Sequence, residues 1–346
     1  MDKKLNIHQI IDEFHSILKN NVVPEETKWS GIDNLSASDR HFYRYRSNEG
    51  SYVCVYDPDF NRIKAETLTK VIDRIHNLNI NIPKLIHIDK TKHTLIWEDI
   101  GDDSLLRKIV SQKWTFEKFR TFTEKEIIPI LVKCWKFGPD ADLPEFGFVK
   151  YMFEWDFHVI SQLSKPINLF DKNPAFLELL LTEYASILQQ LLETRSVLIH
   201  RDLQSTNMFF KNNQLYLLDF QDMRNGHPLY DLVSFIYDSY TPWNWSERYS
   251  LLMEIIDNLA HEIDSLRERT QLKKEAEFLI VQRKIHDAGA FVYNFKRTGR
   301  SDFLQFVLPT LEMARQACLQ CDKQNLTSFI TFLKENYEKM DILGYR

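Results

Sequence analysis

The sequence predicts an α+β protein with a small β-rich region near the N-terminal end and a larger, mostly helical region after it. Apolar and polar residues alternate between residues 41 and 97, interrupted by one helical stretch. After residue 104 the apolar residues recur at helical spacing over long segments. The chain has 346 residues, a length that suggests about two domains at roughly 150 residues each.

The composition is that of a globular protein. Hydrophobic residues make up 44% and charged residues 27% of the chain, which excludes disordered and collagen-like classes. The formal net charge of −5 argues against a general nucleic-acid binder, because such proteins carry a basic face. We therefore expect no nucleic-acid partner, and the sequence does not predict an oligomeric state.

The four cysteines are too few for a secreted disulfide framework. Cys318 and Cys321 form a C-x-x-C in a helical stretch, and we interpret them as two thiols on one helix face because no second ligand pair completes a zinc site. The first residues show no apolar run of the signal-peptide kind, and no long apolar window indicates a membrane span. The expected compartment is the cytoplasm.

The N-terminal region has a predicted order of elements. An amphipathic helix lies within the first 30 residues, and a hairpin follows, with strands at 41–46 and 51–56. Asp59 is the predicted N-cap of the next helix. The remaining elements are that helix at 62–78, strands at 84–88 and 94–97, and a polar linker at 98–103.

The C-terminal region is predicted to be helical around a small β insert. A helix is expected at 114–137 with a kink at Pro129, and Asn173 followed by Pro174 opens another helix. The predicted strands of the insert are 197–199, 208–210 and 215–218, and we expect them to form a three-stranded meander. Helices are predicted to resume at residue 229.

Three oxygen-bearing side chains fall at the ends of these short strands. Asp202 follows the first strand, Asn207 precedes the second, and Asp219 follows the third. A meander would bring them to one end of the sheet. Asp202 can accept a proton from a hydroxyl, and Asn207 with Asp219 supplies the hard oxygen ligands that Mg²⁺ prefers. A base beside such a pair is the equipment for phosphoryl transfer.

The spacing is that of a kinase catalytic loop. His-x-Asp is followed after five residues by Asn and after twelve more by Asp-Phe, on strand–loop–strand–turn–strand. A lone aspartate in a loop is usually a turn former, whereas four matched positions in the right order indicate a function. His200 is interpreted as a backbone anchor of the loop and not as the base.

The sequence resembles the aminoglycoside phosphotransferase and choline kinase superfamily, and within it the bacterial anomeric kinases of N-acetylmuramate and N-acetylglucosamine. The resemblance rests on stretches spread over most of the chain, with the catalytic block the most specific. These stretches are Ser36–Arg40 before Tyr43–Arg44, Leu95–Asp102, His200–Asp202, Asn207, Leu218–Asp222, Gly226, Tyr230–Ser234, Asp238 and Val281–Lys284.

The resemblance implies a two-lobe, protein-kinase-like fold that uses ATP and Mg²⁺. Residues 1–103 would form the nucleotide-binding lobe, and residues 104–346 the helical lobe with a catalytic loop at 200–207 and a metal-binding segment at 219–222. It further implies roles for single residues. These are Asp202 as base, Asn207 and Asp219 as Mg²⁺ ligands, Glu98, Asp99 and Ile100 as the hinge that binds the purine through its backbone, and Ser36, Ser38 and Arg40 as the phosphate loop.

The sequence departs from the kinase pattern at three places. The phosphate loop has no G-x-G-x-x-G, and the strand at 51–56 has no lysine, Tyr56 lying near its place. The phosphates are then expected to be held by Arg40 or Arg44, or mainly by Mg²⁺. Asp219 is followed by Phe-Gln instead of Phe-Gly, and no Ala-Pro-Glu follows, which argues against a protein kinase.

Two further aspartates follow the metal segment. Asp231 heads a helix, where a carboxylate is favourable, and we interpret it as a structural support of the catalytic loop. Asp222 is a candidate substrate contact, with a position away from the substrate equally open.

Three functions remain open at this point. The leading one is a kinase for the anomeric hydroxyl of an N-acetylated amino sugar, on the block formed by Asp219–Asp222, Gly226 and Tyr230–Leu232. The second is a phosphotransferase for an aminoglycoside or choline, which requires an acidic or aromatic pocket. The third is a nucleotide-binding pseudokinase, suggested by the missing glycines and lysine and opposed by the intact catalytic triplet.

Overall fold

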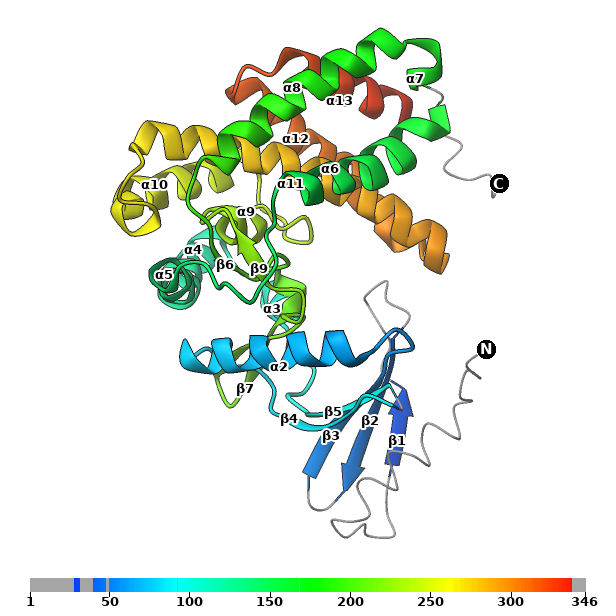
Figure 1. The fold of residues 1–346 in the computed structure, drawn as a ribbon, viewed down its shortest axis with the longest axis vertical. Helices are drawn as coiled ribbons and strands as arrows, with labels where there is room; N and C mark the ends of the chain where they lie inside the picture. The colour runs from blue at the N-terminus through cyan, green and yellow to red at the C-terminus, as the bar shows by residue number, and fades with distance from the viewer. Residues whose placement is uncertain (1–27, 32–39, 48–49, 92, 168, 338–346) are drawn as a thin grey trace. The chain divides into compact units, whose positions relative to one another are not determined.

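A computed structural model describes residues 28–31, 40–47, 50–91, 93–167 and 169–337. The expected N-terminal helix, Ser36 and Ser38 lie outside these described residues. The chain divides into two compact units, one made of Met1–Asp103 with Phe209–Gln221 and the other of Ser104–Met208 with Asp222–Arg346. We call them unit 1 and unit 2 and describe each by itself (Figure 1).

Unit 1 is built on a five-stranded antiparallel sheet with the strand order β1-β2-β3-β5-β4. Alternation of apolar residues places Tyr43, Cys54 and Ile96 side by side across β2, β3 and β5, and all three are buried. The sequence-predicted strands are therefore confirmed within a residue or two. Their bounds are β1 Lys28–Gly31, β2 His41–Ser47, β3 Gly50–Tyr56, β4 Leu85–Asp89 and β5 Thr94–Glu98.

One helix, α2 (Arg62–Asn77), accompanies this sheet and buries Leu68, Val71 and Ile75 (Figure 1). Its N-cap is Asn61, whose side chain accepts the N–H of Lys64 at 3.0 Å. The prediction of Asp59 as the cap was wrong. The N–H of Asp59 instead donates to Asp57 within a turn that precedes the helix, and Asn61 is the last polar residue before the helical run.

The hairpin β7–β8 belongs with unit 1, apart from the first residue of β7. Its strands are Met208–Lys211 and Gln214–Leu217, and the turn residues Asn212 and Asn213 both have positive φ, as a tight hairpin turn requires. Asn81, just after α2, accepts the N–H of Leu217 at 2.9 Å and donates its side-chain amide to the carbonyl of Leu215 at 3.2 Å. The segment that follows α2 therefore anchors the hairpin through Asn81.

The expected three-stranded meander is not what forms. β6 (Val197–Ile199) pairs with β9 (Arg224–Gly226), while β7 and β8 make a separate two-stranded sheet. The prediction missed β9 because it is three residues long and contains a charged residue and a glycine. Gly226 is required there, since a Cβ would lie 2.4 Å from Cδ1 of Ile199.

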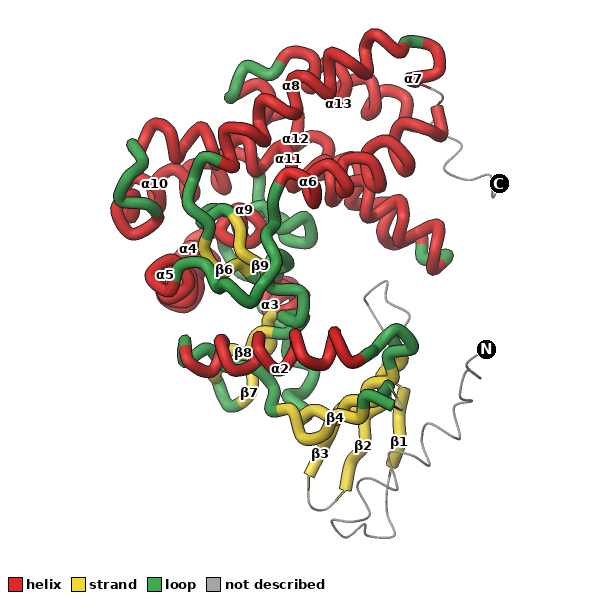
Figure 2. Tube along the Cα trace, in the orientation of Figure 1, coloured by secondary structure: helices red, strands yellow, loops and turns green. Residues whose placement is uncertain are grey.

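Unit 2 is predominantly helical (Figure 2). The sequence-predicted cap at Asn173 is confirmed, its side chain accepting the N–H of Phe176 at the start of α8. The helices of the unit are α3 Leu105–Ser111, α4 Phe116–Phe122, α5 Ile128–Phe137, α6 Phe148–Glu154, α7 Leu169–Lys172, α8 Pro174–Leu192, α9 Tyr230–Ile236, α10 Trp245–Ile263, α11 Arg269–Thr298, α12 Val307–Gln320 and α13 Gln324–Asn336.

The helix expected at 114–137 is interrupted one turn earlier than the predicted kink. A π-helical turn, Thr123–Ile127, separates α4 from α5, and Pro129 stands in the first turn of α5. The wider π turn before it accommodates the N–H that proline lacks, so the helical path continues through Pro129.

The long helix α11 lies at the centre of unit 2 and contacts α12, α10, α9 and the π-helical segment Trp155–Ser164. Gly289 permits the closest of these approaches, since a Cβ there would lie 2.3 Å from the carbonyl oxygen of His158. Cys318 and Cys321 are buried free thiols at the end of α12. Within the described residues, no helix is both long enough and apolar enough to cross a lipid bilayer.

Candidate active site

Unit 1 brings together two predicted site residues that are far apart in the sequence. Arg40, at the entrance to β2, lies with Nη1 3.9 Å from Oδ1 of Asp219, and its Nε donates to Asp57 at 3.0 Å. Asp57 is buried, whereas Asp219 is 43% exposed on its side chain. The buried carboxylate fixes the arginine, and the guanidinium thus lies beside an exposed carboxylate.

The backbone at Asp219 is held in an unusual conformation. Its φ is 61°, in the left-handed region that aspartate tolerates better than most residues. Phe220 is buried and packs edge-on against Trp97 of β5, with ring centroids 5.8 Å apart. The amide of Gln221 donates to Oδ1 of Asp219 at 2.6 Å. Burial of the phenylalanine therefore anchors the turn that leaves the Asp219 carboxylate exposed.

Arg44 holds the predicted hinge in place. Its guanidinium donates to both carboxylate oxygens of Asp102 at 2.7 and 2.8 Å, and its Nε lies 2.8 Å from Asp99. Burial raises the pKa of Asp99, but hydrogen bonds from Ser51 and from the N–H of Gly101, together with Arg44, outweigh it and lower that pKa. Two carboxylates engage Arg44, which favours a tie between β2 and the hinge over a phosphate contact.

The hinge is also tied to the β7–β8 hairpin. Lys211 donates to the Glu98 carboxylate and, at 3.2 Å, to the carbonyl oxygen of Asp99. The N–H of Glu98 donates to Lys84, and that of Asp99 to Ser51. Among the described residues, the main chain of Ile100 has no hydrogen-bonding partner in unit 1. The hinge therefore keeps one backbone N–H and one carbonyl, those of Ile100, that no described group of unit 1 engages.

In unit 2 the start of the catalytic loop is fixed by a single buried carboxylate. The two oxygens of Asp231 accept the backbone N–H groups of His200 at 2.6 Å and of Arg201 at 2.9 Å. Burial raises the pKa of Asp231, opposed by His200 and these two hydrogen bonds. Asp231 thus braces the loop directly after β6, and His200 contributes to this contact through its backbone.

Arg201 adopts a backbone conformation that arginine rarely takes. Its φ is 76°, in a region where a long side chain is strained. The Asp231 hydrogen bond holds its N–H, and its carbonyl accepts Nη1 of Arg283 at 3.0 Å. Both peptide groups flanking this residue are therefore pinned, which sets the direction of the following side chain, Asp202.

Asp202 is 31% exposed and receives a hydrogen bond from a residue of α11. Nη2 of Arg283 lies 3.0 Å from its Oδ1. Burial raises the pKa of Asp202, but the charges of Arg283 and Arg201 and the hydrogen bond outweigh it, so that pKa is lowered. The side chain is consequently an ionised carboxylate at neutral pH and can accept a hydrogen bond from a hydroxyl.

The end of the catalytic loop is held by two polar side chains. Nδ2 of Asn207 donates to the carbonyl of Asp202 at 2.9 Å, and this contact orients the amide so that its oxygen points away from that carbonyl. The buried carboxylate of Asp238 accepts the N–H of Ser205 at 2.8 Å. The loop thereby keeps a fixed form between Asp202 and Asn207.

The donor atoms suit a hard cation. Asn207 offers an amide oxygen and Asp219 an exposed carboxylate, which are the ligand types that Mg²⁺ takes in small number beside substrate phosphates. Within the described ranges, no group of three or more His, Cys, Asp and Glu side chains forms a closed metal cage. Taken one by one, Asn207 of unit 2 and Asp219 of unit 1 each offer an oxygen of the kind that Mg²⁺ binds.

Asp222 is exposed and lies close enough to Arg224 and Arg201 to stabilise their charged forms. Burial and the neighbouring charge of Arg201 lower the pKa of Arg224. Several guanidinium groups therefore lie around the catalytic loop, and the positive charge of Arg224 is only partly balanced by the nearby carboxylate of Asp222.

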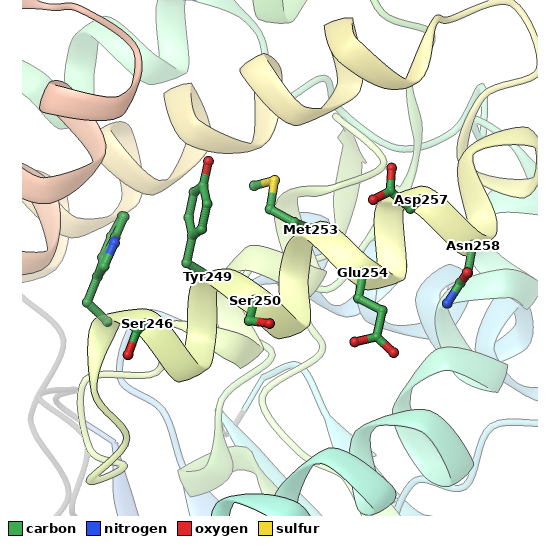
Figure 3. A pocket seen from close by; sticks show the side chains of 8 residues that line it. Ser246, Tyr249, Ser250, Met253, Glu254, Asp257 and Asn258 are labelled. Carbon is green, nitrogen blue, oxygen red and sulfur yellow. The ribbon is translucent and has the colours of Figure 1, made fainter.

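A shallow pocket runs along α10 and is lined by residues of that helix. Tyr249, Met253 and Asp257 point to one side of it (Figure 3). Two of these reach α11, since the Tyr249 hydroxyl donates to Glu277 at 2.7 Å and Asp257 pairs with Lys273 at 2.6 Å. None of the predicted site residues lines this pocket, so it is distinct from the kinase signature.

The sequence reasoning missed Arg283 as a contact of Asp202 and Asp238 as a support of the loop. Both belong to stretches that carried the family resemblance, Val281–Lys284 and Asp238. That resemblance marked the positions without giving their partners.

Comparisons with known proteins agree with this geometry. Residues 141–261 match the model of the phosphotransferase enzyme family. An N-acetylmuramate/N-acetylglucosamine kinase of Neisseria meningitidis is 22% identical over 271 residues, which cover 76% of this chain and 78% of the relative.

Solved structures show the same fold. The choline kinase LicA of Streptococcus pneumoniae superposes with a TM-score of 0.57 at 13% identity, covering 92% of this chain and 99% of that one. The ADP-bound aminoglycoside phosphotransferase APH(2'')-Ib gives 0.55 at 19% identity over 89% and 98%. An ethanolamine kinase of Plasmodium vivax gives 0.59 at 15% identity over 92% and 91%.

The α+β, protein-kinase-like fold predicted from the sequence is confirmed by these superpositions. Residues 141–261, which contain Asp202, Asn207 and Asp219, match the phosphotransferase enzyme family, and the chain shares the fold of the choline kinase and aminoglycoside phosphotransferase structures.

Proposed function

We propose that this phosphotransferase moves the γ-phosphoryl group of ATP to the anomeric hydroxyl of an N-acetylated amino sugar. The observation that carries the proposal is the similarity to a kinase of N-acetylmuramate and N-acetylglucosamine over three quarters of both chains. ADP in the structure of APH(2'')-Ib and AMP in that of LicA support a nucleotide as the second substrate. The cytoplasm stays the predicted compartment.

In the proposed reaction Asp202 accepts the proton of the acceptor hydroxyl as its oxygen bonds to the γ-phosphorus and the bond to ADP breaks. Arg40 contacts the phosphates, and the backbone of Glu98–Ile100 binds the purine. Asn207 and Asp219 would hold Mg²⁺, which when bound would supply positive charge to offset that of the phosphate oxygens. Chelation by EDTA should abolish turnover, and added Mg²⁺ should restore it.

The test is ATP consumption in a coupled assay with N-acetylglucosamine, N-acetylmuramate, kanamycin and choline as acceptors. The matched control is the 1-O-methyl glycoside of N-acetylglucosamine, which lacks only the anomeric hydroxyl. Turnover of the free sugars but not of the glycoside, with a glycosyl phosphate seen by ³¹P NMR, is the expected result. If only kanamycin or choline is phosphorylated, the proposed amino-sugar acceptor is wrong.

The role of Asp202 has its own test. Asp202→Asn should lower kcat by roughly 10²–10⁴-fold while ATP binding changes little, since a general base acts in the chemical step. Asp257→Asn, at a half-buried residue of α10 that pairs with Lys273, is the matched control and should keep wild-type kcat. Full activity in Asp202→Asn would exclude this residue as the base.

A further inference from the structure

We propose that Arg283 of α11 is the positioning residue for the catalytic base, holding Oδ1 of Asp202 so that Oδ2 is presented to the acceptor hydroxyl. The inference rests on the proposed role of Asp202 and deepens it, because it explains how one oxygen of a partly exposed carboxylate is selected. It concerns unit 2 alone.

Arg283 makes three contacts on the catalytic-loop side. Nη2 donates to Oδ1 of Asp202 at 3.0 Å, and Nη1 donates to the carbonyl of Arg201 at 3.0 Å and to the Tyr230 hydroxyl at 3.2 Å. The planar guanidinium thus binds the backbone before the base and the base itself with one rigid group. A lysine has a single nitrogen and cannot span both acceptors.

The guanidinium is itself fixed from behind. Its side chain is 4% exposed, and Nε lies 3.1 Å from Oδ1 of Asp287, one helical turn along α11. Arg283 and Lys284 lower the pKa of the Asp287 carboxyl against the effect of burial. Asp287 also pairs with Lys284 at 2.5 Å, whose Nζ donates to the carbonyl of Tyr237. Because Nη1, Nη2 and Nε all have partners, the guanidinium is held in a fixed orientation.

The two oxygens of Asp202 are therefore not equivalent. Among the described residues, hydrogen bonds to the Asp202 carboxylate go to Oδ1, from Arg283. The carboxylate is 31% exposed although the arginine is almost wholly buried, so Oδ2 is the oxygen left to meet a substrate hydroxyl. A carboxylate that rotated freely would spend part of its time in unproductive orientations, which lowers kcat more than it raises KM.

The experiment is a double-mutant cycle on kcat, with Asp202→Asn, Arg283→Gln and the double variant. If Arg283 acts through Asp202, Arg283→Gln lowers kcat at least tenfold in the wild type, raises KM for either substrate less than threefold, and changes kcat less than twofold in the Asp202→Asn background. Additive losses would overturn the proposal. Arg283→Lys should recover part of kcat, and full recovery would also contradict it.

Arg248→Gln is the matched control for burial. This arginine is equally buried and donates to backbone carbonyls, including that of Thr241 at 2.7 Å. We expect it to lower the unfolding temperature at least as much as Arg283→Gln does, while kcat stays within about threefold of wild type. If both variants lose kcat in proportion to stability, Arg283 is merely structural and the proposal fails.

A second variant covers the case in which Arg283→Gln does not fold. Tyr230→Phe removes only the hydroxyl that accepts from Nη1 of Arg283, and it should lower kcat about threefold with unchanged KM. Unchanged kcat in folded Tyr230→Phe and folded Arg283→Lys overturns the proposal. A wild type that phosphorylates no acceptor defeats the proposed function instead, so the two failures are distinguishable.

Discussion

Nη1 of Arg40 lies 3.9 Å from Oδ1 of Asp219, which joins the entrance of β2 to the turn after β8 within unit 1. A cation beside an exposed carboxylate is the arrangement expected where a phosphate and its metal ion bind. Neither the G-x-G-x-x-G nor the strand lysine of kinases is present in this sequence, so Arg40 is the residue on which phosphate binding is expected to depend.

Arg40→Gln should therefore raise KM for ATP about tenfold, since hydrogen bonds to charged groups contribute roughly 1.5–3 kcal/mol and ~1.4 kcal/mol corresponds to a factor of ten. Steady-state kinetics with varied ATP measure it. Arg46→Gln, an exposed arginine on the same strand, is the control and should leave KM unchanged. An unaltered KM for ATP in Arg40→Gln would show that Arg40 does not bind the phosphates and would leave that role to Arg44 or to Mg²⁺ alone.

Asp231→Asn should weaken the brace of the catalytic loop. One of its two oxygens becomes an N–H₂ group facing a backbone N–H, and an unsatisfied buried group costs about 1–3 kcal/mol. Urea unfolding measures that loss, and kcat should fall with it because the loop before Asp202 is released. Asp264→Ala removes a buried acceptor of a backbone N–H, that of Leu266, and should lower stability but not kcat.

Glu312 predicts a pH dependence of stability. Hydrogen bonds from Arg315 and Lys334, partly offset by burial, lower its pKa to about 2. Because the folded pKa is below the unfolded one, the stabilisation is complete above the ordinary glutamate value and disappears as pH falls toward 2. The carboxylate is 35% exposed, so solvent screening keeps the effect small.

Thermal unfolding of Glu312→Gln and the wild type should therefore differ at pH 6, and the difference should vanish near pH 2. Glu335→Gln, an exposed residue of α13, serves as the control for a simple change of net charge. A difference that grows on acidification would contradict this assignment.

Gly289→Ala should destabilise unit 2 by about 1–3 kcal/mol, the usual cost of overpacking a core. The added Cβ would lie 2.3 Å from the carbonyl oxygen of His158, and a backbone atom inside a packed segment cannot move aside cheaply. This clash outweighs the ~1 kcal/mol by which alanine normally favours a helix. Ala290→Gly measures that propensity contribution at the neighbouring position, and a stabilised Gly289→Ala would disprove the close approach.

Much of unit 1 was predictable because its signals are local. The alternation of buried Tyr43 and Tyr45 with Phe42 and Arg46 marks β2, and the apolar spacing of α2 is read within one segment. The N-cap failed because Asp59 and Asn61 are both good caps. Only the turn made by Asp57 decides between them.

The sequence predicts candidate residues for the site but not the contacts between them. The spacing of Asp202, Asn207 and Asp219 marks a kinase loop, whereas the strand that pairs with β6 is too short for a periodic signal. A role for Arg44 in binding the phosphates stays a prediction. The sequence does not reveal its bidentate contact with Asp102, because no local pattern encodes that pairing. Arg283 belongs to the same class of long-range contact.

The separation of 81 residues between Arg283 and Asp202 has a consequence for biosynthesis. A polypeptide emerging from the ribosome exposes the entire kinase signature well before α11 has been translated. Without α11 the nascent protein has the base but not the group that we propose orients it. Phosphoryl transfer would thus reach its full rate only once α11 has folded against the catalytic loop, and termination products that lack α11 would turn over ATP more slowly.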